Sequence, residues 1–160
     1  MIRFCVWEQE TFADLSLEFF GKGAGFLSPS EFMKELLSRR TIYRPEAYVF
    51  VLQGMQYTQK KLEKPRHLTG QEFARSLAAF ARHLYGALAK DVLAEWGIKK
   101  TIDFGHIVYD LIEMGQMSKR PEDSLEDFRD IYDFDDELGS GFDWSDEILA
   151  GLSRNSKQPE

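Results

Sequence analysis

Three residues near position 106 have the types and spacing that metal binding or proton transfer requires. A helix through Asp103, His106 and Asp110 would bring all three side chains to one face. An imidazole flanked by two carboxylates suits a metal site or a proton relay. The alternative is a solvated polar face opposite an apolar face that begins at Phe104, since helix surfaces often present such triples. We favour this alternative, and we predict no catalytic residue, no metal site and no cofactor.

A second candidate is the stretch DFRDIYDFDDELGSGFDW, residues 127 to 144, which interleaves aromatic and acidic side chains. A calcium-binding EF-hand loop needs glycine at position 6 and a bidentate glutamate at position 12. A loop that starts at Asp133 has Leu138 and Trp144 at these positions, and a loop that starts at Asp135 fails as well. The stretch therefore indicates a contact surface rather than a metal site.

Aromatic side chains within an acidic segment suit protein binding, because the rings can anchor in a groove while the carboxylates steer the partner. The candidate partner-binding residues are Phe134, Phe142 and Trp144. In the alternative, these rings pack on the chain's own core and the acids pair with the basic residues at positions 60 to 66. The sequence leaves both interpretations open.

Lys60, Lys61, Lys64 and Arg66 form a basic cluster at a predicted helix end, and such a cluster can neutralise nucleic-acid phosphates. Helix C-termini favour Lys and Arg for dipole reasons alone, so the cluster needs no ligand. The helix expected to read DNA would present acidic residues to the groove, where Arg, Lys, Asn or Gln are normally found. Nucleic-acid binding is therefore the alternative function, and it is electrostatically disfavoured.

The charge of the chain is unevenly distributed. Its 160 residues carry a net charge of −7, but residues 121 to 147 hold twelve acids and one base, Arg129. Residues 1 to 120 hold fourteen acids and seventeen bases. This asymmetry predicts an electrostatic partner, either another molecule or the chain's own basic part.

The elements that must position these residues are mostly helices. Ser28 and Thr69 are typical N-caps, and Gly97 and Gly115 stand where helices end. With the apolar spacing between them, these signals predict helices from residue 29 through 37, then over 45–64, 70–85, 88–96 and 101–114.

Beyond Gly115 the pattern changes to an alternation of apolar and polar residues, which predicts a β-hairpin with residues 127 to 134 as its second strand. The expected fold class is mainly α with a small β-hairpin, in a winged-helix-like arrangement over residues 69 to 134. A helical bundle with an attached hairpin is the alternative. The predicted organisation is an N-terminal segment (1–27), a helical domain (28–137) and an acidic-aromatic extension (138–160).

Four segments resemble a family of conserved bacterial proteins of unknown function, found mainly in planctomycetes and verrucomicrobia. They are RPEAYVFVLQGMQYTQKKLEKPRHLTGQEF (44–73), GI (97–98), DFGHIVYDLIEMG (103–115) and SLEDFRDIYDF (124–134). The resemblance covers roughly residues 43 to 137. It implies a small intracellular protein and brings no assigned activity with it.

The sequence predicts a cytoplasmic protein without a membrane partner. Cys5 is the only cysteine, the N-terminus does not resemble a signal peptide, and the apolar run AYVFVL (47–52) is too short to cross a bilayer. The predicted function is a non-enzymatic protein-interaction or regulatory module. The sequence does not decide whether the chain forms a homo-oligomer. The alternative is a nucleic-acid-associated regulator, and the third hypothesis is a small enzyme or metal-binding protein.

Overall fold

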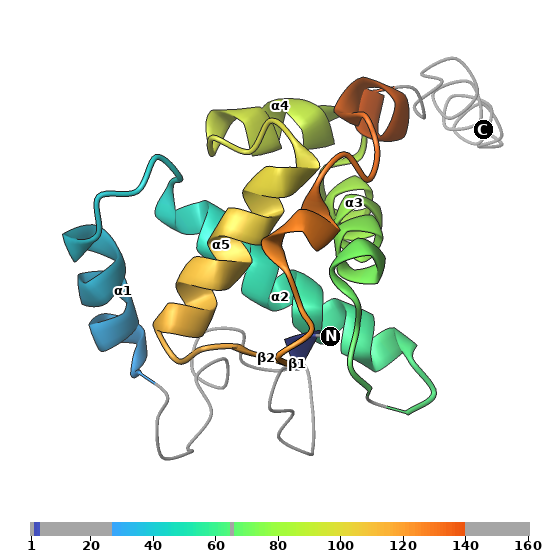
Figure 1. The fold of residues 1–160 in the computed structure, drawn as a ribbon. Coiled ribbons are helices and arrows are strands. Elements are labelled where there is room, and N and C mark those ends of the chain that lie inside the picture. Colours follow the sequence, from blue (N-terminus) through green and yellow to red (C-terminus); the bar gives the residue numbers. More distant parts are fainter. Residues whose placement is uncertain (1, 4–26, 65, 140–160) are drawn as a thin grey trace, which may run out of the picture.

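The described part of the chain has a mainly helical fold (Figure 1). The computed structural model describes residues 2–3, 27–64 and 66–139. The elements are, in order, β1 (Ile2–Arg3), α1 (Pro29–Ser38), α2 (Pro45–Lys61), α3 (Gly70–Tyr85), η1 (Gly86–Leu88), α4 (Ala89–Glu95), α5 (Thr101–Glu113), β2 (Ser118–Lys119), η2 (Leu125–Phe128) and η3 (Asp135–Gly139). Within these ranges no helix combines the length and the apolar composition needed to span a membrane.

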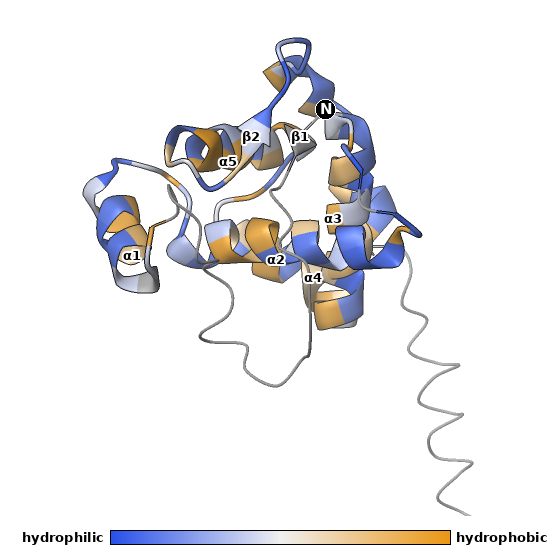
Figure 2. Cartoon of the chain, turned by 90° about the horizontal axis from the view of Figure 1, so that it is seen from below, coloured by the Kyte–Doolittle hydropathy of each residue, from blue (hydrophilic) through white to orange (hydrophobic). Residues whose placement is uncertain are grey.

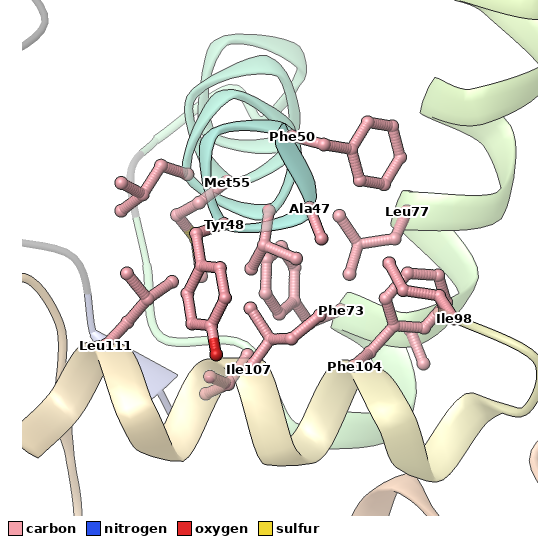
Figure 3. Packing of buried hydrophobic residues seen from close by; sticks show 14 of the residues in the cluster. Ala47, Tyr48, Phe50, Met55, Phe73, Leu77, Ile98, Phe104, Ile107 and Leu111 are labelled. Carbon is pink, nitrogen blue, oxygen red and sulfur yellow. The ribbon is translucent and has the colours of Figure 1, made fainter. Parts of the chain in front are cut away.

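The helices α2 and α5 occupy the middle of the fold. Figures 1 and 2 place α1 at one side of this pair and α3 at the other, with η3 beside α4 in Figure 1. In Figure 2 each helix carries both hydrophobic and hydrophilic residues. The apolar faces of α2, α3 and α5 meet and bury one common core (Figure 3).

Aromatic side chains from three helices form the centre of this core. The ring of Phe50 on α2 stacks on Phe80 of α3 at 5.2 Å between centroids and lies 6.4 Å from Phe104 of α5. Phe50, Phe73 and Phe104 are almost completely buried. Because each such side chain contributes about 2 kcal/mol by burial, this cluster fixes the relative positions of α2, α3 and α5.

The predicted helix starts are confirmed for α1 and α3. Ser28 accepts a hydrogen bond from the backbone N–H of Glu31 at 3.3 Å, and the Glu31 carboxylate accepts one from the Ser28 N–H at 2.8 Å. Thr69 and Glu72 repeat this reciprocal arrangement at 3.1 and 2.9 Å. Each capping box satisfies backbone donors that the first helical turn leaves without partners.

The predicted end of α4 at Gly97 is also confirmed. Gly97 has φ of 91°, and its N–H donates to the carbonyl of Ala94, while the Ile98 N–H donates to Leu93. This is the Schellman arrangement, which needs a residue that tolerates positive φ. A Cβ atom at Gly97 would also lie 3.0 Å from the carbonyl oxygen of Ile42, so glycine permits a close approach of the segment before α2.

The predicted β-hairpin is wrong. Residues 127–134 form no strand, and β2 pairs instead with β1 in an antiparallel ladder that aligns Ile2 with Lys119. Ser124 caps η2 by accepting from the Glu126 N–H, and Asp130 then adopts a φ of 49°, which ends any extended run. Local capping therefore outweighs the alternation in this segment, and the arrangement predicted for residues 69–134 has no wing.

The apolar residues of this segment pack on α5 and α3. A Cβ atom at Gly105 would lie 2.8 Å from Leu125 Cδ1 and 2.9 Å from Phe128 Cβ, so only glycine lets η2 approach α5 this closely. Phe128 is 1% exposed. The alternation interpreted as a strand face is instead the packing pattern of a short 3₁₀ helix and the chain that follows it.

Three leucines that continue the helical spacing of the apolar residues are exposed. Leu37 of α1, Leu84 of α3 and Leu88 of η1 keep 71%, 44% and 59% of their surface in contact with solvent. Each stands in or near the last turn of a helix or in a short connecting element. Helical spacing identifies a face, but it does not show how far along the helix the neighbouring elements extend.

Candidate functional site

The segment between α1 and α2 and the first turn of α2 lie along a polar face of α5, and three side-chain contacts hold them there. The acceptors on α5 recur at helical spacing and so share one face. The contacts are Tyr43 Oη to Asp103 Oδ1 (2.8 Å), Tyr48 Oη to Asp110 Oδ2 (2.6 Å) and Arg39 Nη1 to Glu113 Oε2 (3.0 Å). We call this row of contacts the α5 seam, and we call residues 39–44 the 39–44 loop.

Tyr48 connects the core to the seam. Its ring is fully buried between α2 and α5, and its hydroxyl reaches α5 (Figure 3). The hydroxyl donates to Asp110 and lies 2.8 Å from Thr41 Oγ1, so Thr41 donates to it in turn. Burial and the Asp110 carboxylate raise the pKa of Tyr48, so the hydroxyl stays protonated and remains a donor.

Asp103 has a structural role at the start of α5. Its Oδ2 accepts hydrogen bonds from the backbone N–H groups of Lys99 and Lys100 at 2.8 and 2.9 Å, and its Oδ1 accepts from Tyr43. Burial and this carboxylate raise the pKa of Tyr43 as well. Asp103 therefore caps the helix and holds the 39–44 loop at the same time.

An open cleft of about 510 Å³ lies beside the seam. Its lining comes from the 39–44 loop and from α5. The lining residues are Arg39, Arg40, Thr41, Ile42, Tyr43, His106 and Asp110. His106 is exposed, and among the described residues it has no hydrogen bond or ion pair. Unlike Asp103, Asp110 and Glu113, it has no partner in the α5 seam.

The structure brings together two of the three residues predicted on this face. His106 and Asp110 line the cleft, whereas Asp103 does not. Asp103 and Asp110 are only partly exposed, and each accepts a hydrogen bond from a tyrosine hydroxyl, so they do not form the fully solvated face that was predicted. Residues 2–3, 27–64 and 66–139 contain no group of three side chains placed to hold a metal ion.

The two hydroxyls in the cleft are engaged within the fold. Nucleophilic catalysis needs a hydroxyl or thiol within hydrogen-bonding reach of a base. In the cleft, the hydroxyls of Thr41 and Tyr43 are already bonded to Tyr48 and Asp103, and neither is bonded to His106. The cleft does present the imidazole of His106 and the guanidinium of Arg40, and both side chains are exposed to solvent.

Ile42 is the most exposed large hydrophobic residue of the described chain, at 80%, and it lines the cleft. Hydrogen bonds hold its neighbours in the chain in place. Thr41 and Tyr43 are bonded as above, and the Arg44 N–H donates to the carbonyl of Trp96 at 3.1 Å. Sequence reasoning did not identify Ile42, because it stands outside any periodic element and no pattern assigns it to a face.

The basic cluster is partly committed to contacts within the chain. Arg66 donates twice to Glu72, at 2.9 and 3.2 Å, and it lowers the pKa of that carboxylate to about 2. The ammonium group of Lys61 lies 4.3 Å from the centroid of the Tyr57 ring. Lys60 and Lys64 are exposed. Two of the four predicted nucleic-acid-binding residues thus have structural roles.

Phe134 packs on its own domain. It is 6% exposed, and its ring centroid lies 5.9 Å from that of Phe104 and 5.8 Å from that of Tyr132. Phe142 and Trp144, the other two predicted partner-binding residues, lie outside the described residues. For Phe134, the interpretation in which the aromatic ring folds back onto the core therefore holds.

The acids beside Phe134 pair with α3 and α4. Arg82 donates to the Glu137 carboxylate at 2.6 Å, and Lys90 contacts Asp135. The intramolecular alternative had assigned these acids to the basic residues at positions 60 to 66. For Asp135 and Glu137, the partners come from α3 and α4 instead.

Comparisons with protein-family models, with curated proteins and with solved structures find no match to this chain. The resemblance to the bacterial family therefore stays a prediction. The functional argument rests on the geometry of the cleft and of the loop beside it.

Proposed function

We propose that this protein is a non-enzymatic protein-interaction module that binds its partner through the 39–44 loop and the adjoining cleft. The observation that carries the proposal is Ile42, an aliphatic side chain 80% exposed on a loop that partly buried hydrogen bonds hold in place. A large apolar side chain next to a cleft can anchor a partner when it fills a pocket on that partner.

The fixed conformation of the loop supports this role. Ordering a loop on binding costs free energy, and a loop that is already ordered avoids this cost. Thr41 and Tyr43 are held on either side of Ile42, and the Arg44 N–H is bonded to α4. The anchor is thus presented in one conformation before the partner arrives.

Affinity capture with matched variants tests the proposal. The baits are the wild-type chain, Ile42→Asp and Leu88→Asp, since Leu88 is also exposed, at 59%, but lies on η1 away from the cleft. We expect a protein that the wild type and Leu88→Asp retain and that Ile42→Asp loses. With that protein purified, calorimetry should show at least a tenfold weaker affinity for Ile42→Asp, as expected for the loss of an apolar anchor.

The result that contradicts the proposal is also defined. Both substitutions are at exposed positions, so the thermal unfolding midpoints should stay close to that of the wild type. If Ile42→Asp is folded and retains every protein that the wild type retains, the 39–44 loop is not the docking surface.

A further inference from the structure

His106 is the one residue of the polar face of α5 without a partner among the described residues. The residues around it determine which ligand can bind there. Each acid of the face has a partner in the seam, Asp103 and Glu113 from the 39–44 loop and Asp110 from α2, whereas His106 has none among the described residues. Arg40 also lines the cleft, and it is exposed and has no ion pair within the same part of the chain. The cleft therefore presents an imidazole and a guanidinium that the fold does not use.

These two groups are both hydrogen-bond donors, and an arginine fork matches a carboxylate especially well. Asp110 also lines the cleft, but its Oδ2 already accepts a 2.6 Å hydrogen bond from Tyr48. The ligand that complements Arg40 and His106 is therefore an anionic group small enough to enter between them.

A single carboxylate suits this position better than a phosphate chain does. Asp110 is in the cleft, so its carboxylate would repel a ligand with several negative charges in a row. Ile42 provides apolar surface immediately beside the two donors. A charged group and an aliphatic group are thus needed side by side, which a peptide supplies.

We infer that the cleft binds an acidic peptide segment, in which a Glu or Asp carboxylate accepts hydrogen bonds from Arg40 and His106 while a neighbouring aliphatic side chain packs on Ile42. This inference rests on the proposed interaction function and names the chemistry of the partner. Arg40 and His106 select the charge, and Ile42 supplies the apolar contact.

Nuclear magnetic resonance titration of the full chain tests the inference with defined probes. The probes are N-acetyl-leucyl-glutamyl amide, its glutaminyl analogue, inorganic phosphate and a short oligothymidine strand. We expect the glutamyl peptide to give saturable amide shifts at residues 39–44 and 106–110. The glutaminyl analogue, which keeps the shape and loses the charge, should bind about tenfold more weakly.

Arginine variants localise the charge contact. Arg40→Gln should weaken binding of the glutamyl peptide about tenfold. The matched control is Arg75→Gln, at an exposed arginine of α3 that also has no ion pair among the described residues, and it should bind as the wild type does. His106→Asn should weaken the binding of the glutamyl peptide and leave the binding of the glutaminyl analogue unchanged.

Three outcomes would overturn the inference. They are equal binding of the glutamyl and glutaminyl peptides, equal effects of Arg40→Gln and Arg75→Gln, and tighter binding of phosphate or oligothymidine at the same amides. Each of these outcomes can be distinguished from a failure of the proposed function. If Ile42→Asp loses its partner while the two peptides bind equally, the docking surface stands and only the acidic chemistry of the partner is wrong.

Discussion

The α5 seam and the η3 turn both attach a distant segment to the helical core, but they do so with different chemistry. The seam uses tyrosine hydroxyls, one of them fully buried, that donate to Asp103 and Asp110. The turn η3 uses exposed ion pairs, Arg82 with Glu137 and Lys90 with Asp135, above a buried Phe134.

The difference identifies which contacts fix each segment. A hydrogen bond in a buried, low-dielectric environment is strong, and its loss leaves a polar group without a partner. An exposed ion pair is screened by water and salt and contributes little. We therefore expect the 39–44 loop to depend on its polar contacts, and η3 to depend on Phe134 rather than on its ion pairs.

The largest effect is expected from Phe134→Ala. Phe134 is 6% exposed and contacts Phe104 and Tyr132, so truncation leaves a cavity in the core. We expect the free energy of unfolding to fall by about 3 kcal/mol, measured by urea denaturation. A loss below about 1 kcal/mol would mean that the ion pairs, and not the ring, hold the η3 segment.

A smaller but clear loss is expected from Tyr48→Phe, which removes only the buried hydroxyl at the seam. Asp110 and Thr41 then lose their shared partner, and the free energy of unfolding should fall by about 2 kcal/mol. The matched control is Tyr85→Phe, at a half-buried tyrosine whose hydroxyl has no hydrogen bond among the described residues, and it should change stability by less than about 0.5 kcal/mol. Equal losses in the two variants would show that the seam is not held by its hydrogen bonds.

The smallest effect is expected from Arg82→Gln. The Arg82–Glu137 pair is 40% and 38% exposed, so its removal should lower the free energy of unfolding by less than about 1 kcal/mol. The difference from the wild type should shrink further when urea denaturation is repeated at about 1 M salt, because salt screens exposed charges. A loss as large as that of Tyr48→Phe, and equally large in salt, would remove the distinction between the two regions.

The helices could be predicted from the sequence because their signals are local. Ser28 and Thr69 lie three residues from the glutamates that complete their capping boxes, and Gly97 directly follows the helix that it ends. The hairpin could not be predicted correctly, because alternation does not distinguish a strand from chain that packs against Gly105. Whether η2 can approach α5 depends on tertiary contacts that no local pattern reports.

The candidate site was predicted only in part, for a similar reason. Helical spacing correctly placed Asp103, His106 and Asp110 on one face. Their partners Tyr43 and Tyr48 lie 60 and 62 residues earlier in the chain, and nothing in either segment indicates that the two meet. The exposure of Ile42 could not be predicted for the same reason. It depends on where the seam places the loop, and the seam joins segments that are far apart in the sequence.

Because Gly97 lies close to the carbonyl of Ile42, the two positions differ in which substitutions they tolerate. Any side chain at position 97 would require positive φ and would push the loop away, so exchange there alters the scaffold. The Ile42 side chain projects into solvent, so it can be replaced at little cost in stability. The residue at position 42 can therefore change while the fold that presents it stays the same.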